Sequence, residues 1–369
     1  MAVVAYLVRR ALVTLALLVV LSMVTFAIFY FLPADPARII TGFGNPPPEV
    51  FARINHAFGT DQPLTEQYLR YMSGVVRGDF GTSWIGSSVD PETGELVGRS
   101  VWPILRSALA VTASLALGGA LLMLLFAVPL GVLAASRYGG WLDRILITLT
   151  LIAISTHPLV VGFVLRLVAA DRLGIAPPIG YCPFGGVDES STDGGSTSSA
   201  VSAFTLGECT GPASWAHHLA LPWITFSLLL VAIYMRMVRA RMIETMREPH
   251  IRTARAKGAS EWRVTTRHAL RPALAPLIPM LAMDLGLAVG LAMYVEAVYQ
   301  LPGLGRLAVD ALAGLVGYDR PVIVGIVLVT GTVIVLLNLV ADLLLTVVDP
   351  RVRHGAVSRG ERSGAGRPA

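Results

Sequence analysis

The sequence predicts an all-α membrane protein with six transmembrane helices and both termini in the cytoplasm. Three observations support this prediction. Of the 369 residues, 54% are hydrophobic and only 14% are charged, whereas soluble domains carry about 25% charged residues. The apolar residues are gathered into long uncharged runs, and most arginines lie in alternate connections between these runs. Such a composition cannot cover a water-facing surface, so a soluble cytosolic enzyme is excluded.

The first transmembrane helix is predicted over residues 11–32, a run that ends at the sequence Leu32-Pro33-Ala34-Asp35-Pro36. Its 22 residues, at about 1.5 Å each, cover the roughly 30 Å of bilayer hydrocarbon. A cleaved signal peptide is the alternative, because Arg9 and Arg10 precede the run. The apolar part of a signal peptide is only about 7–15 residues long, so we favour an uncleaved helix.

Five further helices pass the same length test. They are predicted over residues 102–135, 145–169, 219–235, 274–298 and 321–348. Pro129 and Pro158 lie inside two of them, and neighbouring helices can satisfy the carbonyl groups that these prolines leave free. We therefore expect a five-helix core over residues 102–348, with kinks at the two prolines.

The arginines orient the predicted bundle, because basic connections stay in the cytoplasm. Basic residues lie before the first helix, between the second and third, between the fourth and fifth, and after the sixth. Residues 32–100 instead carry eight acids against five arginines, and residues 171–218 carry five acids against one arginine. Residues 33–101 are therefore predicted to be extracytoplasmic, and residues 349–369 are predicted to form a disordered cytoplasmic tail.

The second outer connection, residues 171–218, contains a polar low-complexity insert over residues 188–200. Cys182 and Cys209 flank the insert and would face the oxidising side of the membrane. A disulfide between them would stabilise the loop by roughly 3 kcal/mol. We favour this disulfide over two free thiols.

The connection between the fourth and fifth predicted helices, residues 236–272, is strongly basic. Nine arginines and Lys257 against three glutamates give it a net charge of +7, although the whole chain carries only +5. Pro249 can begin a short helix that ends at Gly258, where a left-handed turn is favourable. Ser260 can cap a second helix that runs from Glu261 to Leu270. The pattern thus predicts a two-helix hairpin.

Three interpretations of this basic connection are open: a cluster that sets membrane topology, a nucleic-acid-binding element, and a docking element for a cytoplasmic motor subunit. Nucleic-acid binding is disfavoured, because the connection has only about 35 residues between two membrane spans. Trp262, Val264 and Leu270 are too few to form a core, which favours docking onto another protein. The chain contains no Gly-Lys pair and no H-E-x-x-H sequence, so it has neither a P-loop nor this zinc motif.

The hairpin sequence resembles the coupling loop of ABC-importer permeases, and in particular the dipeptide, oligopeptide and nickel branch of that family. The resemblance rests on residues 252–258 (RTARAKG) and 267–271 (RHALR). Further matching segments, in the same order, are residues 32–36, 61–68, 77–83, 295–305, 338–342 and 349–351. The resemblance covers nearly the whole chain, except the insert over residues 188–200 and the tail. Arg252 and Thr253 stand where the general motif has Glu and Ala, so contacts of that Glu are not transferred.

The resemblance implies a permease subunit, not an enzyme, in the bacterial inner membrane. Its implied partners are a second homologous permease, two ABC ATPase subunits that hold ATP and magnesium, and an extracytoplasmic binding protein. Membrane lipid surrounds the complex, and no nucleic acid, metal or cofactor is expected in this chain. The implied substrates are di- or oligopeptides, with nickel, glutathione or haem as alternatives. The implied ATPase-coupling residues are Arg252, Thr253, Ala254, Arg255, Lys257, Gly258, Ser260, Glu261, Arg263, Val264, His268 and Leu270.

Polar residues inside the predicted helices are candidates for the translocation path or a gate, because such residues are unfavourable in lipid. They are Asp284, Glu296, Asn338 and Asp342, together with Arg166. Hydrogen bonding between helices is the alternative interpretation, which we prefer for Asn338 and Asp342. His157 is expected to be a packed, hydrogen-bonded side chain.

Two other protein classes are alternatives. A secondary transporter or channel would also contain six spans, but it is disfavoured because the sequence shows no matched broken helices in internal repeats. An intramembrane hydrolase is disfavoured because no Gly-x-Ser-x-Gly sequence occurs at membrane depth.

Overall fold

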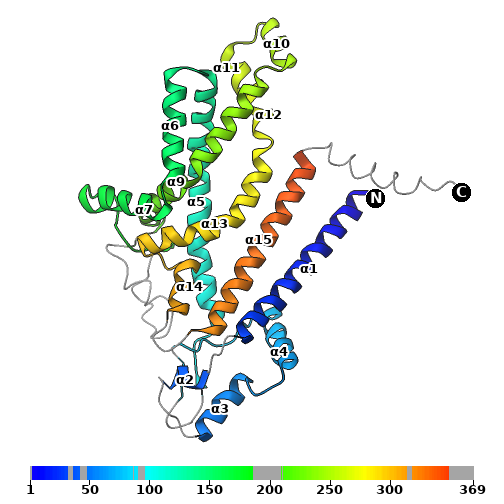
Figure 1. The fold of residues 1–369 in the computed structure, drawn as a ribbon, viewed down its shortest axis with the longest axis vertical. Helices are drawn as coiled ribbons and strands as arrows, with labels where there is room; N and C mark the ends of the chain where they lie inside the picture. Colours follow the sequence, from blue (N-terminus) through cyan, green and yellow to red (C-terminus); the bar gives the residue numbers. More distant parts are fainter. Residues whose placement is uncertain are drawn as a thin grey trace, which may run out of the picture.

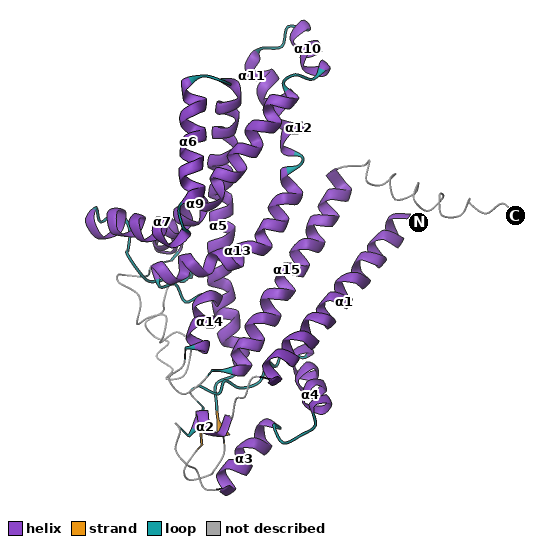
Figure 2. Ribbon diagram, viewed as in Figure 1, coloured by secondary structure: helices purple, strands orange, loops and turns teal. Residues whose placement is uncertain are grey.

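The computed structural model describes residues 2–31, 36–41, 48–85, 87–89, 96–185, 209, 211–313 and 318–348. Within these ranges the chain is almost entirely helical, with one small pair of strands (Figures 1 and 2). The low-complexity insert and the predicted disordered tail lie outside the described residues, so those two predictions stay predictions.

Four helices are each long and apolar enough to cross a membrane. They are α1 (Ala2–Phe31), α5 (Val101–Ser136), α9 (Pro212–Thr245) and α15 (Arg320–Val348). Two further spans are present if each of two bent helix pairs counts as one. The all-α membrane class is therefore confirmed, and the described residues contain four to six candidate spans.

The first bent pair corresponds to the predicted span over residues 145–169. α6 (Trp141–Ser155) ends at an extended Thr156. The next helix consists of α7 (Pro158–Leu165) and the π-helical segment η1 (Arg166–Arg172), and it is bent by 105° from α6. The ring of Pro158 disfavours helical geometry at the preceding residue, and His157 is accordingly extended at ψ 137°. The kink predicted at Pro158 is thus present, and it is a sharp corner between two helices.

The second bent pair lies at the end of the fifth predicted span. α13 (Leu277–Tyr299) stops at Gln300, which has a left-handed backbone at φ 54°. The chain then turns by 75° into α14 (Leu304–Leu312), which the sequence analysis did not predict. α14 lies beside α5, α13 and α15 (Figure 1).

α5 and α9 form the closest helix pair of the core. Gly118, Gly119 and Gly131 on α5 face large side chains of α9. A Cβ on Gly119 would lie 2.4 Å from Phe226, and one on Gly131 would lie 2.7 Å from Val238. Small residues at such positions let membrane helices approach closely, which replaces the hydrophobic effect as the source of packing energy.

α9 is longer than the predicted span over residues 219–235. It continues to Thr245, so Arg236, Arg239 and Arg241 lie on a helix and not in a loop. Val238, Met242 and Thr245 are buried against neighbouring elements, which supplies the packing that extends the helix beyond its apolar run. The non-helical part of the basic connection is correspondingly shorter than predicted.

The segment between α1 and α5 contains α2 (Pro36–Ile40), α3 (Pro48–Phe58) and α4 (Leu64–Val76). It also contains the antiparallel strands β1 (Ser88–Val89) and β2 (Leu96–Val97). α4 is held against α1, because Tyr68 lies 2.9 Å from the hydroxyl of Ser22 and contacts the ring of Phe26. α2, α3 and α4 lie at the opposite end of the molecule from the basic connection (Figure 1).

Candidate functional site

The basic connection folds as a helical hairpin, which we call the basic hairpin and define as residues 249–274. It begins with α10 (Pro249–Ala256) and turns at Gly258, whose φ is +82°. It returns through α11 (Glu261–Arg263), the π-helical segment η2 (Val264–Ala269) and α12 (Leu270–Leu274). The predicted start at Pro249 and turn at Gly258 are both present. The hairpin projects beyond the ends of α5 and α6 (Figure 1).

An ion pair closes the hairpin across its turn. Nε and Nη2 of Arg255 donate to the two carboxylate oxygens of Glu261 at 2.8 and 3.1 Å. Such two-point contacts fix orientation as well as distance. The arginine holds the pKa of Glu261 below its usual value, mainly through the hydrogen bond. The ion pair therefore restrains the two arms of the turn relative to each other.

The base of the basic hairpin packs into the main core. Ile251, Val264 and Ala269 are fully buried, and Ala273 is nearly so. Trp262 instead has 79% of its surface exposed. An exposed tryptophan beside arginines is typical of a binding surface, because aromatic and arginine side chains are enriched at interfaces.

The twelve predicted coupling residues divide by exposure. The exposed ones are Arg252, Thr253, Arg255, Lys257, Gly258, Ser260, Glu261 and Arg263. Ala254, His268 and Leu270 are half-buried. Val264 is buried inside the hairpin, so it can support a docking surface without forming part of one. Ser260 occupies the N-cap position, but its side chain makes no capping hydrogen bond.

The second arm of the hairpin was predicted to end at Leu270, before Pro272. In the structure it continues through Pro272 to Leu274. Proline has no N–H and leaves a carbonyl of the preceding turn without its helical donor. Nε2 of His250 on α10 lies 3.4 Å from the carbonyl oxygen of His268, four residues before Pro272. The two arms are thus linked where the proline interrupts the helix.

A buried ion pair fixes the end of α9 from which the hairpin extends. Nε and Nη2 of Arg239 donate to the carboxylate of Asp143 at 2.6 and 2.8 Å, and the amide of Gly139 donates to the same carboxylate at 2.9 Å. Asp143 is 2% exposed, and Arg239 also lies over the ring of Tyr138. The sequence analysis missed this pair, because it counted Arg239 only as a loop charge. The signal available in the sequence was Asp143 itself, an acid in the first turn of α6 that needs a partner when buried.

The polar residues predicted for the path or gate do not form one cluster in the described part of the chain. Asp284 accepts a hydrogen bond from Tyr234 at 2.7 Å. Asp342 pairs with Arg10, and both line a cavity of about 270 Å³ together with Asn338. Helix-to-helix bonding therefore accounts for Asp284 and Asp342, and their part in translocation stays a prediction.

Glu296 has a different role from the other three, because its carboxylate caps α14. Oε2 accepts from the amides of Gly305 and Arg306 at 2.8 and 3.1 Å, and Oε1 accepts from Thr112 of α5 at 2.6 Å. Glu296 is fully buried. A Cβ at Gly303 would lie 2.2 Å from the carboxylate, which explains the glycine. The gate hypothesis for Glu296 is untested, but its contacts join α5, α13 and α14.

Asp319 is a second buried carboxylate that joins distant segments, and it was not predicted from the sequence. Its carboxylate accepts from the hydroxyl of Ser83 and from the amides of Trp84 and Ile85, the amides at 3.2 and 3.1 Å. Asp319 is 2% exposed and immediately precedes α15. It therefore anchors the segment after α4 to the beginning of the last helix. The signal available in the sequence was an acid two residues before the helix predicted over residues 321–348.

The remaining singled-out residues stabilise the first bend. Arg166 donates to the carbonyl of Val298 at 2.6 Å, and the ring of His157 contacts Tyr294 edge-on. Nδ1 of His157 also accepts from the amide of Leu159 at 3.3 Å. His157 is thus packed and hydrogen-bonded, as expected.

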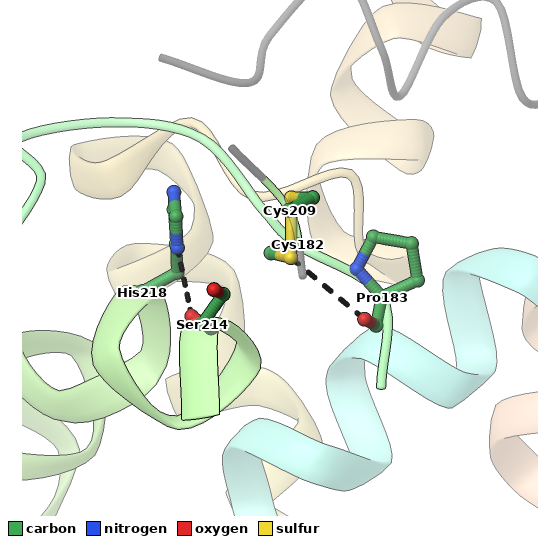
Figure 3. The surroundings of a disulfide bond; sticks show 5 residues. All are labelled: Cys182, Pro183, Cys209, Ser214 and His218. Atoms are coloured by element: carbon green, nitrogen blue, oxygen red, sulfur yellow. Dashed lines mark hydrogen bonds between the residues drawn. A yellow bond between two sulfur atoms is a disulfide. The ribbon is translucent and has the colours of Figure 1, made fainter. Parts of the chain in front are cut away.

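Cys182 and Cys209 are joined by a disulfide, with their Cα atoms 5.6 Å apart (Figure 3). Cys182 is fully buried, and two residues before it the amide of Gly180 donates to the carbonyl of Tyr299 at 3.1 Å. The base of the outer connection is thereby attached to the bend between α13 and α14. Among the described residues, no group of three or more histidine, cysteine or acidic side chains could hold a metal ion.

Comparisons with known proteins cover nearly the whole chain. A family profile described as binding-protein-dependent transport system inner membrane component matches residues 127–354. The profile for the N-terminal part of such membrane components matches residues 3–116.

The similar proteins include transport permeases of several named systems. The chain is 32% identical over 350 residues to the dipeptide transport system permease protein DppB of Escherichia coli K12, covering 95% of this chain and 98% of the relative. It is 31% identical over 349 residues to a probable peptide ABC transporter permease, y4tP, of Sinorhizobium fredii, covering 95% and 99%. It is 30% identical over 352 residues to the glutathione transport system permease protein GsiC of Salmonella paratyphi A, again covering 95% and 99%.

Proposed function

The chain belongs to the binding-protein-dependent inner-membrane permeases of ABC importers, and on this premise we propose that its basic hairpin receives the motion of a partner ATPase. The chain is a permease subunit of the bacterial inner membrane. Family membership also argues against the alternative of an ATP-independent secondary transporter.

The observation that carries the proposal is the geometry of the basic hairpin. The hairpin is exposed at Arg252, Lys257 and Arg263, whereas the neighbouring Ile251 and Val264 are buried. The Arg255–Glu261 pair restrains the turn, and the Asp143–Arg239 pair fixes the adjoining helix. A load applied at the tip would therefore move α9 and α12 as one body, which is how rigid elements transmit subunit motion.

We propose a six-span topology with both termini cytoplasmic, in which each bent pair counts as one span. It is supported by the arginine distribution and by the position of the hairpin opposite α2–α4 (Figure 1). In this topology two ATPase subunits, which carry ATP and magnesium, bind at the hairpin side. A second homologous permease completes the pathway, and an extracytoplasmic binding protein delivers substrate at the α2–α4 side.

Short peptides are the proposed substrate. The named activities of the similar proteins are transport of peptides, of dipeptides and of glutathione, which is itself a tripeptide. Glutathione is accordingly the second candidate.

Substitutions at Gly258 test the proposal, because different side chains at this position separate the effect of added volume from the effect of backbone strain. A Cβ at this position would meet nothing within 4 Å in this chain, but φ is +82°. Gly258→Ala adds strain without bulk, Gly258→Asn adds a residue that tolerates a left-handed backbone, and Gly258→Trp adds bulk that only a docked partner would meet. The complex should be co-expressed with its ATPases, second permease and binding protein.

We expect Gly258→Asn and Gly258→Ala to retain most peptide uptake. The complex with Gly258→Trp should assemble and hydrolyse ATP, but its peptide uptake should fall about tenfold or more. A clash of about 1.4 kcal/mol in the coupled state lowers the rate of transport by a factor of about ten. Uptake and hydrolysis in proteoliposomes measure the two quantities separately. Equal coupling in Gly258→Trp and Gly258→Ala would contradict the proposal, as would substrate transport by this chain alone without ATP.

A further inference from the structure

A cavity of about 340 Å³ lies where α4 meets α1 and the beginning of α15. It is formed by Phe26 of α1, by Arg70 and Tyr71 of α4, by Trp84 and by Arg320. None of these residues belongs to the basic hairpin or to the candidate path. The cavity persists because Tyr68 fixes α4 to α1 on one side, and Asp319 fixes the Trp84 segment to α15 on the other.

Two hydrogen-bond donors on the wall of this cavity have no partner among the described residues. They are the indole Nε1 of Trp84 and the hydroxyl of Tyr71. Trp84 is only 4% exposed, and its ring packs edge-on against Phe58, so the indole N–H is shielded from solvent. Burial raises the pKa of Tyr71, so its hydroxyl remains a donor at physiological pH. Buried donors without a partner are rare and unfavourable.

The charges around the cavity favour an anionic ligand. Arg70 and Arg320 line it, and the Arg320 guanidinium lies over the ring of Phe26 at 5.8 Å. The acid on the same wall is Asp79, whose Oδ1 already accepts from the amide of Gly81 at 2.9 Å. Two cations, two free donors and one acid together match a group rich in acceptor oxygens.

The position of the cavity identifies the source of that group. Phe26 lies in the apolar span Val8–Ile28 of α1, and Arg320 begins the apolar span of α15. The cavity therefore lies at the ends of two apolar spans, where hydrocarbon gives way to headgroups in the proposed topology, and aromatic side chains and arginines line it together. We propose that it binds the phosphate of an anionic phospholipid headgroup, with Arg70 and Arg320 as charge partners and with Trp84 and Tyr71 as donors. This site is separate from the proposed coupling function and does not depend on which side of the membrane it faces.

Binding can be tested on the full chain, purified in detergent and stripped of lipid. The probes are phosphatidylglycerol, diacylglycerol with the same acyl chains, and soluble glycerol phosphate, each detected by native mass spectrometry. Arg70→Gln removes an exposed charge, and Trp84→Phe removes the indole donor together with part of the ring. Arg53→Gln, an exposed arginine of α3 that does not line the cavity, is the matched control.

We expect phosphatidylglycerol to bind at least about tenfold more tightly than diacylglycerol. Arg70→Gln and Trp84→Phe should each weaken the binding of phosphatidylglycerol about tenfold, because one hydrogen bond to a charged group contributes a factor of about this size. Arg53→Gln should bind like the wild type. Without lipid, Tyr71→Phe should have an unchanged or higher melting temperature, because it removes an unpartnered hydroxyl and keeps the ring. Arg70→Gln decides the result if Trp84→Phe does not fold.

Three outcomes would overturn the proposal. Equal binding of phosphatidylglycerol and diacylglycerol would show that the phosphate is not recognised. Unchanged affinity in Arg70→Gln would place any lipid elsewhere and leave water as the partner of the two donors. Binding of glycerol phosphate as tight as that of the lipid would identify a soluble anion, and not a membrane headgroup, as the ligand.

Discussion

Asp143 and Arg239 illustrate how one buried ion pair fixes the end of α9 from which the basic hairpin extends. Their two hydrogen bonds are 2.6 and 2.8 Å long, and Asp143 is 2% exposed. Asp143→Asn would leave the guanidinium without a counter-charge, and breaking a buried pair costs about 3–5 kcal/mol. We expect the lower end of this range, since Arg239 keeps some contact with solvent, and a clear fall in melting temperature in detergent.

The pair formed by Arg241 and Glu244 is a control for this prediction. It lies on the same helix, but its side chains are 46% and 66% exposed, and exposed pairs contribute about 0–1 kcal/mol. Glu244→Gln should therefore leave the melting temperature nearly unchanged. A similar loss in both variants would contradict the structural role assigned to Asp143.

Glu296 allows the capping and gating hypotheses to be separated. Glu296→Gln replaces one acceptor oxygen by a donor that cannot face the amides of Gly305 and Arg306. If the residue acts as a cap, the variant should lose about 0.5–2 kcal/mol of stability or more. Thr112→Val should also destabilise, because Thr112 both donates to Glu296 and accepts from the amide of Leu304.

Thermal stability and peptide uptake should be measured on both variants of this junction. Capping predicts that uptake falls in proportion to the amount of folded complex. A fully stable Glu296→Gln complex without uptake would instead support the gate and reject the capping account.

At the scale of elements, the basic hairpin is predicted to loosen in acid. Arg255 lowers the pKa of Glu261 in the folded chain, so the pair stabilises the turn above the unfolded pKa of about 4.3 and loses this effect as the pH falls through the lower folded value. Both residues are exposed, so salt should weaken the pair as well. Hydrogen exchange of residues 255–261 should therefore speed up below about pH 4, beyond the intrinsic change in exchange rate.

The charge-swapped double variant Arg255→Glu with Glu261→Arg is the control for the hairpin. It should restore slow exchange at neutral pH, whereas each single variant should not. Equally fast exchange in the double and single variants would show that the ion pair does not restrain the turn.

At the scale of the whole molecule, the disulfide provides a test of the proposed orientation. Cys182 and Cys209 are the only cysteines in the chain. In intact spheroplasts we expect no labelling by a membrane-impermeant maleimide until an impermeant reductant is added, and then labelling of Cys209, which is partly exposed. Labelling without a reductant would indicate free thiols. Labelling of inside-out vesicles, but not of spheroplasts, would invert the proposed topology.

The sequence alone predicted much of the architecture, because the signals involved are local. Long apolar runs need only composition to be recognised, and they correspond to α5 and α15 within one residue at each end, whereas α1 begins nine residues before the predicted span. Pro249 and Gly258 likewise mark a start and a turn through their own backbone chemistry. The resemblance to the importer permeases rested on short motifs in order, which the family profiles support.

The contacts between distant segments could not be predicted in the same way. Glu296 with Thr112, Asp319 with Ser83, and Asp143 with Arg239 are separated by about 100 residues or more. An acid in a sequence does not reveal which amide or guanidinium it will meet, so Asp319 and Arg239 were missed. The sharp bend after α13 was missed for the same reason, since the capping of α14 by Glu296 depends on three helices.

Composition and backbone preferences therefore determined that this chain is a membrane protein, which apolar runs are candidate spans, and where the basic hairpin turns. Only the tertiary structure decided which polar groups are consumed in holding helices together and which remain available on a surface or in a cavity. The physical reason is that burial in or beside a bilayer forces every polar group to find a partner, and the identity of that partner is set by packing between segments far apart in the chain.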